Sequence, residues 1–171
     1  MSKVITFSQR FPSHHVDAGK PTYFVEKFLN SLDIDYNSLT YLDLLIKLNP
    51  ELPRGLLVSF YEVLYAFIDD KKKHTIRDGN RFISGEKFSP RIWSGKPYNS
   101  KQIIIAPDQV VKTFDIKFYP SELIFINNNK FTALQDLALN DGLTEIQLKK
   151  WFKFPINFHG QIICWDPTLE Y

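Results

Sequence analysis

The segment KKKHTIRDGNRFISGEKFSPRIW, which runs from Lys71 to Trp93, predicts two β-strands joined by a turn at residues 78–80. Runs rich in Thr, Ile and Phe on both sides of Asp-Gly-Asn are typical of strands and their connection. Because side chains alternate between the two faces of a strand, Thr75 and Arg77 are expected on one face and His74 on the other. A neighbouring hydroxyl and guanidinium suit an anion or a planar polar ligand, and the same pattern also suits an exposed sheet edge protected by charge.

Positive charge is concentrated in this part of the chain. Residues 71–101 contain nine Lys or Arg and two acidic residues, a net charge of +7, whereas the rest carries −5 and the whole chain +2. A basic segment on a mildly acidic body suits a phosphate-bearing or otherwise anionic partner. A solvated charged surface is the alternative.

Length and composition indicate one globular domain. The chain has 171 residues, of which 44% are hydrophobic and 23% charged, so a core can form without disulfides. The single cysteine, Cys164, excludes an intramolecular disulfide and a cysteine-rich metal site. No apolar run is long enough to span a bilayer and no signal-peptide pattern follows Met1, so a cytoplasmic protein without membrane contact is expected. The pair His14-His15 falls in a polar loop, and neither a metal nor a cofactor is expected there.

The N-terminal part predicts a strand followed by helices. Residues 4–11 alternate, with Thr6, Ser8 and Arg10 on the polar face. Residues 20–69 contain three runs at helical spacing, one of them capped by Asn37 or Ser38 and one extending over 56–68. We interpret residues 20–69 as a helical insertion, which could also cover a site.

The C-terminal part predicts several short strands and two helices. Strands are expected at 102–106, 109–118, 122–127 and 158–165, which is typical of a barrel or a sandwich. Helices are expected at 132–139 and after Thr144, where Gln147 three residues later completes a capping box.

The pattern Lys72-x-x-Thr75-x-Arg77, followed by Gly85-Glu86-Lys87, resembles the signature of ASCH domains, small PUA-like β-barrels linked to RNA and nucleotide chemistry. The family pattern is Gly-x-Lys-x-x-Glu-x-Arg; here Asp70 replaces the Gly and Thr75 the Glu. Thr at this place is typical of a short bacterial amidohydrolase branch that removes the acetyl group from N4-acetylcytidine. The likeness covers residues 4–12 and 70–165.

The resemblance implies an α+β fold, a PUA-like β-barrel of ASCH type with an inserted helical subdomain, in which residues 1–171 form a single domain and 20–69 the insertion. It also implies a small amidohydrolase that acts on an acylated nucleobase or nucleoside, with Thr75 as nucleophile and Lys72 as its base. The family Glu before the second helix corresponds to Asp141, which is one methylene shorter and lies in Asn-Asp-Gly, a common turn sequence. Lys72 and Thr75 fall on opposite faces of an ideal strand, so a bulge or an earlier turn is needed to bring them together.

Five further residues complete the predicted site as substrate-binding groups. Arg77 is expected to bind a carbonyl, an oxyanion or a phosphate, and aromatic side chains are expected to stack on a base; the set is Arg10, His74, Arg77, Trp93 and Tyr98. The expected partner is a modified nucleoside or RNA. Two other functions remain open, a non-catalytic RNA- or nucleotide-binding module and a protein-interaction domain that uses the helical insertion.

Overall fold

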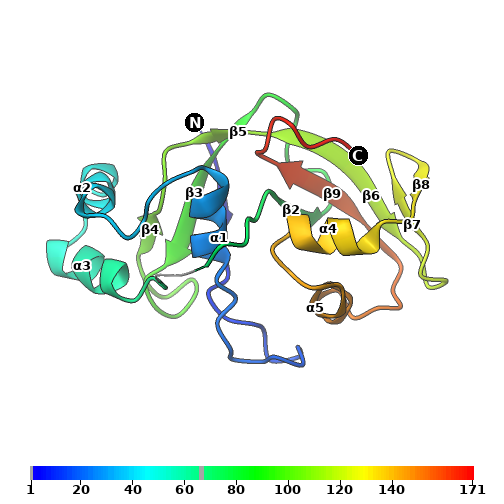
Figure 1. The fold of residues 1–171 in the computed structure, drawn as a ribbon, viewed down its shortest axis with the longest axis horizontal. Helices are drawn as coiled ribbons and strands as arrows, with labels where there is room; N and C mark the ends of the chain where they lie inside the picture. The colour runs from blue at the N-terminus through cyan, green and yellow to red at the C-terminus, as the bar shows by residue number, and fades with distance from the viewer. Residues whose placement is uncertain (1, 66–67) are drawn as a thin grey trace.

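The computed structural model describes residues 2–65 and 68–171, and these form an α+β fold with five helices and two sheets (Figure 1). The elements follow one another as β1 (Lys3–Thr6), α1 (Phe24–Ser31), α2 (Leu39–Leu48), α3 (Arg54–Glu62), β2 (His74–Asp78), β3 (Lys87–Trp93), β4 (Gln102–Ile104), β5 (Gln109–Val110), β6 (Lys112–Phe118), β7 (Ile124–Ile126), β8 (Asn129–Phe131), α4 (Leu134–Asn140), α5 (Glu145–Trp151) and β9 (Phe158–Cys164). The helix expected over 56–68 ends at Glu62, and its residues 66–67 lie outside the described ranges.

The first sheet has the order β1-β3-β4, with β5 also paired to β3. β1 and β3 are parallel, with Ile5 opposite Pro90, and the pairing continues past β1 because Phe7 N donates to Arg91 O over 2.8 Å. Alternate residues of these strands point into the core, among them Ile5, Phe88 and Ile92.

The second sheet has the order β2-β9-β6-β7-β8 and is antiparallel throughout. β9 lies between β2 and β6, so Ile163 pairs with Thr75 on one side and with Thr113 on the other. The second half of β9 is a continuous buried run. Gly160 is required in β9 because a Cβ there would lie 2.1 Å from the backbone oxygen of Arg77.

The two sheets meet along one side only, and the expected closed PUA-like barrel is therefore wrong for the described residues. The chain passes from β5 to β6 through Val111, whose backbone pairs with Gly85 and Glu86, so the sheets are continuous there. On the other side β1 and β2 share no ladder, and the side chain of Arg77 crosses this opening to Thr6 O over 2.9 Å. Because a barrel needs a ladder at every neighbouring strand pair, the missing β1–β2 pairing leaves it open.

The segment 20–69 contributes both to the main core and to its edge. In α1, Phe28 is fully buried, and its ring centroid lies 4.7 Å from that of Phe7 and 5.1 Å from that of Trp165. α2 and α3 lie at one end of the molecule beside β4 (Figure 1), where Tyr41 Oη donates to Ile105 O over 3.0 Å. Ser38 caps α2 by accepting from Tyr41 N, as expected for one of the two candidate caps.

α4 and α5 lie together beside the second sheet (Figure 1), and each buries one leucine completely, Leu137 and Leu148. The capping box predicted at Thr144 and Gln147 is confirmed by both of its hydrogen bonds. The loop that follows β1 docks on α5, because His15 Nε2 lies 3.0 Å from the Gln147 carbonyl oxygen. This arrangement brings the chain after β1, the start of β2 and the end of α4 around one region at the opening between the sheets.

Candidate active site

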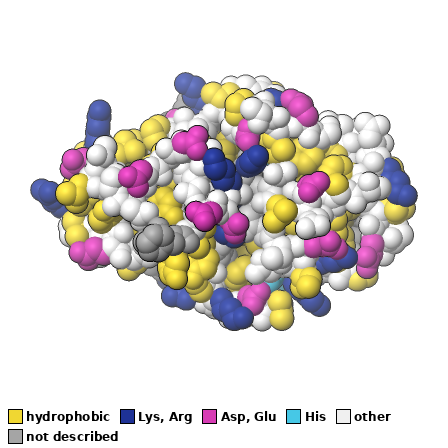
Figure 2. Space-filling model, in the orientation of Figure 1, with side chains coloured by type: hydrophobic (Ala, Val, Ile, Leu, Met, Phe, Trp, Pro, Cys, Tyr) yellow, Lys and Arg dark blue, Asp and Glu magenta, His cyan; other side chains and the backbone are white. Residues whose placement is uncertain are grey.

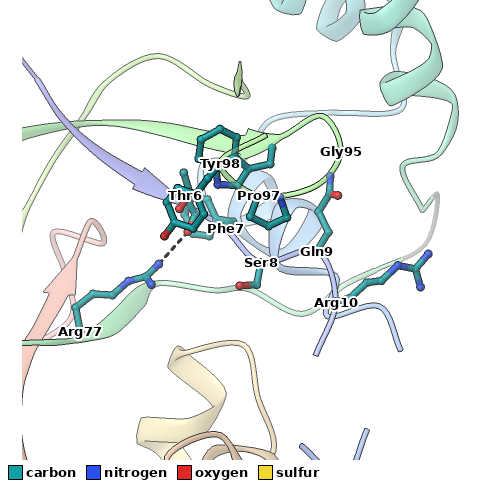
Figure 3. Close-up of a pocket in the computed structure, with 10 residues that line it drawn as sticks. Thr6, Phe7, Ser8, Gln9, Arg10, Arg77, Gly95, Pro97 and Tyr98 are labelled. Atoms are coloured by element: carbon teal, nitrogen blue, oxygen red, sulfur yellow. Dashed lines mark hydrogen bonds between the residues drawn. The ribbon is translucent and has the colours of Figure 1, made fainter. Parts of the chain in front are cut away.

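A large cavity of about 530 Å³ lies at the opening between β1 and β2 (Figure 3). Its walls come from residues 6–10 after β1, from Arg77 of β2, and from Trp93, Gly95, Pro97 and Tyr98 at the end of β3 and in the following loop. The volume falls within the range of small-molecule sites, roughly 300–1,000 Å³. The cavity is therefore large enough in volume for a small-molecule ligand.

A second cavity of about 30 Å³ lies against the first, since Phe7, Ser8 and Arg77 line both. Its polar walls are Ser8, Lys72, Thr75, Arg77 and Asp141, and its apolar walls are Phe7, Phe24, Ile76 and Trp151. The three residues of the predicted Lys-x-x-Thr-x-Arg pattern and the predicted acid, Asp141, therefore line the same small cavity.

Lys72 and Thr75 share this cavity because Lys72 lies before β2. Its backbone N donates to Lys27 O over 2.9 Å, and Lys73 N donates to Asn140 O over 2.7 Å, so the chain here crosses between α1 and α4. Strand alternation begins only at His74. Residues 71–73 form neither a turn nor a bulge within a strand, and Lys72 reaches the side of Thr75 because it lies outside the strand alternation.

Lys72 is buried against Asp141, with 1% and 5% of the two residues exposed. Lys72 Nζ donates to the Asp141 backbone oxygen over 2.6 Å and also to the Asp141 carboxylate, and it lies 4.1 Å from the centroid of the Phe24 ring. Burial lowers the pKa of Lys72 to about 8, against the opposing effect of the carboxylate, and burial raises the pKa of Asp141. An amine with this pKa is partly neutral near physiological pH, which a general base requires.

The shorter acid reaches Lys72 because of its place at the C-terminal end of α4. Asp141 is the residue directly after the helix, and Gly142 follows with a positive φ of 74°. A Cβ at Gly142 would lie 3.2 Å from Lys72 Cβ and 3.3 Å from Lys27 Cδ. The glycine therefore permits both the turn and the close approach of the lysine stem.

Thr75 lines the small cavity, and 6% of the residue is exposed. Within residues 2–65 and 68–171 no hydrogen bond to the Thr75 hydroxyl is formed, and both hydrogen bonds of Lys72 Nζ go to Asp141. The hydroxyl is thus available to a ligand.

Arg77 separates the two cavities and lines both. One guanidinium nitrogen, Nη2, donates to Thr6 O over 2.9 Å, which holds the side chain across the opening (Figure 3). Burial lowers the pKa of Arg77, but arginine stays protonated in proteins. A guanidinium has five N–H donors, so others are left for a carbonyl, an oxyanion or a phosphate.

Trp93 and Tyr98 form an aromatic pair at the large cavity, with ring centroids 5.3 Å apart. Tyr98 is 88% exposed, so its ring can contact a ligand without displacing the core. Arg10 lines the same cavity but extends away from Arg77 (Figure 3), and its guanidinium donates to Gly19 O over 2.8 Å. The structure therefore places these predicted substrate-binding residues around one space.

Of the predicted site residues, His74 lies outside both cavities. It is completely buried on the face of β2 opposite Thr75, lines neither cavity, and has its Nδ1 2.6 Å from Tyr171 Oη. Its position thus gives no contact with a ligand in either cavity, as strand alternation required once Thr75 faced the site.

Nine residues that line the two cavities were missed by sequence reasoning: Thr6, Phe7, Ser8, Gln9, Phe24, Ile76, Gly95, Pro97 and Trp151. The polar face predicted for residues 4–11 was a signal for Ser8, because it grouped Ser8 with Thr6 and Arg10. No comparable signal exists for Phe24 and Trp151, whose helical spacing is the same as that of core residues.

The three consecutive lysines do not form an unpaired basic patch. Lys71 pairs with Asp33 over 2.9 Å, Lys72 with Asp141, and Lys73 with Asp166 over 3.3 Å. On the face shown in Figure 2, basic and acidic side chains are interspersed. The positive charges of these three lysines are therefore largely balanced by aspartate side chains of the same chain.

The described residues contain no group of three or more His, Cys, Asp or Glu side chains that could hold a metal ion. His15 instead stacks on Phe11 with ring centroids 4.4 Å apart and accepts a hydrogen bond from Asp17 N. No helix in the described ranges is both long and apolar enough to cross a membrane.

Comparisons with protein-family models, with characterised proteins and with solved structures found no match. The resemblance to ASCH domains over residues 4–12 and 70–165 stays a prediction. Function is therefore inferred from the two cavities and the residues that line them.

Proposed function

We propose that this protein is a small amidohydrolase that removes the acyl group from an acylated nucleobase or nucleoside such as N4-acetylcytidine. The observation that carries the proposal is the meeting of Lys72, Thr75, Arg77 and Asp141 at a small cavity that shares a wall with the large cavity.

The nucleophile is Thr75 and the base is neutral Lys72. A neutral amine has two N–H donors and one lone pair, and the carbonyl and carboxylate of Asp141 accept both donors. The lone pair is then left to accept the proton of the Thr75 hydroxyl as its oxygen attacks the acyl carbon. Arg77 supports this step by donating to the oxygen of the tetrahedral intermediate.

The remaining steps return the protein to its starting state. The C–N bond breaks, the departing amine takes the proton from the Lys72 ammonium, and the acyl group stays on Thr75 as an ester. A water molecule then loses a proton to Lys72 and attacks the ester carbon. The Thr75 oxygen leaves with that proton, so that one amide and one water give one amine and one carboxylic acid.

The large cavity holds the rest of the substrate in this proposal. Trp93 and Tyr98 supply a stacking surface for a pyrimidine ring, and stacking on aromatic side chains tolerates the ribose and any attached chain. A free nucleoside or a modified nucleotide within RNA can therefore be bound in the same way.

A second function, non-catalytic binding of a nucleotide or RNA, is favoured by one observation. No hydrogen bond joins Lys72 and Thr75 in the described residues, whereas the aromatic pair and Arg77 already line the large cavity, where they can contact a base and a phosphate. Such binding would weaken steeply with salt and on neutralising Arg77. A complex insensitive to salt would contradict it.

The covalent step gives the sharpest test of the first function. The protein is mixed with N4-acetylcytidine, quenched in acid, digested and analysed by mass spectrometry. An acetyl ester on Thr75 in the parent protein, absent in Thr75→Val, is the expected result. Release of cytidine by an unmodified Thr75 would contradict the nucleophilic role, and no release at all would contradict the amidohydrolase.

A further inference from the structure

One phenol hydroxyl connects the two segments that carry the proposed catalytic groups. Tyr171 Oη lies 2.6 Å from His74 Nδ1 and 3.3 Å from Asn140 Nδ2. His74 directly precedes Thr75 in β2, and Asn140 directly precedes Asp141 at the end of α4. The same hydroxyl therefore contacts both neighbours of the proposed active site.

The hydroxyl of Tyr171 hydrogen-bonds both a neutral imidazole and a side-chain amide. Burial first, and the charge of Lys72 second, lower the pKa of His74 well below its usual range, so the imidazole is neutral and can accept at Nδ1. An amide Nδ2 can only donate. Asn140 Nδ2 therefore donates to Tyr171 Oη, and the same hydroxyl shares a second hydrogen bond with Nδ1 of the neutral His74 ring.

The ring of Tyr171 holds the hydroxyl in place. It packs against His74, Phe114 and Phe131 with centroid distances of 5.5, 5.2 and 5.7 Å. Burial raises the pKa of the Tyr171 hydroxyl, which keeps it protonated across the physiological range. A second link joins the same segments, since Lys73 N donates to Asn140 O over 2.7 Å.

We propose that Tyr171 is a positioning residue, which fixes the distance between Thr75 on β2 and the Lys72–Asp141 pair at the end of α4. The inference rests on the proposed function for its kinetic consequence. The proposal also states that Tyr171 keeps Asp141 next to Lys72. This part can be tested by a titration of Lys72, which does not require the protein to be an active enzyme.

The direction of the effect follows from the charges around Lys72. The Asp141 carboxylate raises the pKa of Lys72, whereas burial, Arg77 and Lys27 lower it. If removal of the Tyr171 hydroxyl lets Asp141 move away, the ammonium loses its stabilising partner and the pKa of Lys72 falls. A role in general packing alone would leave this pKa unchanged.

The experiment compares Tyr171→Phe with Tyr41→Phe. Both variants keep the ring and remove one buried tyrosine hydroxyl, but Tyr41 bonds Ile105 O and lines neither cavity. With N4-acetylcytidine, kcat of Tyr171→Phe is expected to fall on the order of 10-fold or more with KM unchanged, because small misplacements of reacting groups are costly. Tyr41→Phe is expected to keep both constants.

The second readout is a titration of the Lys72 side chain by NMR with lysine labelled at Cε, assigned with Lys72→Met. A lower pKa of Lys72 in Tyr171→Phe than in the parent and in Tyr41→Phe supports the proposal. Equal values in all three proteins, or equal shifts in both variants, overturn it. If the parent is inert toward N4-acetylcytidine, the amidohydrolase fails and the titration still decides the role of Tyr171.

Discussion

The ammonium nitrogen of Lys72 donates to the backbone carbonyl oxygen of Asp141 over 2.6 Å and to the carboxylate of the same residue. Both partners are buried, so this is an ion pair inside the protein. The two contacts use two of the three donors of an ammonium group and would use both donors of a neutral amine. The protonation state of Lys72 thus decides whether a lone pair is available for Thr75.

The activity should increase with pH. Because burial lowers the pKa of Lys72 to about 8 and only the neutral amine acts as base, kcat/KM toward N4-acetylcytidine should rise through about pH 8 and then level off. The measurement is a pH–rate profile between about pH 6 and pH 10. A profile that is flat, or that falls over this range, would rule out Lys72 as the base.

The substitution Asp141→Asn should move this profile to lower pH. The Asp141 carboxylate raises the pKa of Lys72, and its neutralisation removes that effect while a side chain of similar size remains. The midpoint of kcat/KM is therefore expected below that of the parent. A midpoint shifted to higher pH would mean that Asp141 does not stabilise the Lys72 ammonium.

The buried pair should respond to substitution as a unit. Lys72→Met leaves a buried carboxylate without its partner and should lower the free energy of unfolding by about 3–5 kcal/mol, whereas Lys72→Met with Asp141→Leu should recover most of this loss. Lys71→Met is the matched control, because its pair with Asp33 is exposed and is worth about 1 kcal/mol or less. The measurement is urea unfolding at neutral pH, and a double variant whose loss equals the sum of the single losses would contradict the coupling.

The aromatic pair should affect binding and not chemistry. Trp93→Ala or Tyr98→Ala should raise KM by roughly 5- to 150-fold, because stacking is worth about 1–3 kcal/mol per base, and kcat should change little. Tyr119→Ala is the control, since Tyr119 is a half-exposed tyrosine that lines neither cavity. A fall in kcat at constant KM would place the aromatic pair in the chemical step instead.

Strand alternation was sufficient to predict part of the site. Thr75 and Arg77 both lie within β2, so their common face followed from the sequence, as did the opposite face for His74. The place of Lys72 did not follow, because its backbone bonds to Lys27 and precedes the first ladder pair. Such a boundary depends on contacts with α1 and α4 that the local sequence does not encode.

Local signals also predicted several helix ends but not the closure of the sheets. Ser38 and Thr144 cap their helices through their own side chains, which depends only on residues within one turn. A closed barrel depends on whether β1 pairs with β2, and in the structure the side chain of Arg77 reaches Thr6 O there in place of a ladder. That outcome involves residues 71 positions apart and lies beyond any local pattern.

The most direct test of the central claim is the release of acetate from N4-acetylcytidine by the parent protein, by Thr75→Val and by Thr113→Val. The two threonines pair with Ile163 from opposite sides, but only Thr75 lines the small cavity, whereas the Thr113 hydroxyl lies 3.1 Å from Ser84 Oγ. The account predicts turnover by the parent and by Thr113→Val and none by a folded Thr75→Val. Equal acetate release by Thr75→Val, or none by the parent at saturating substrate, would contradict it.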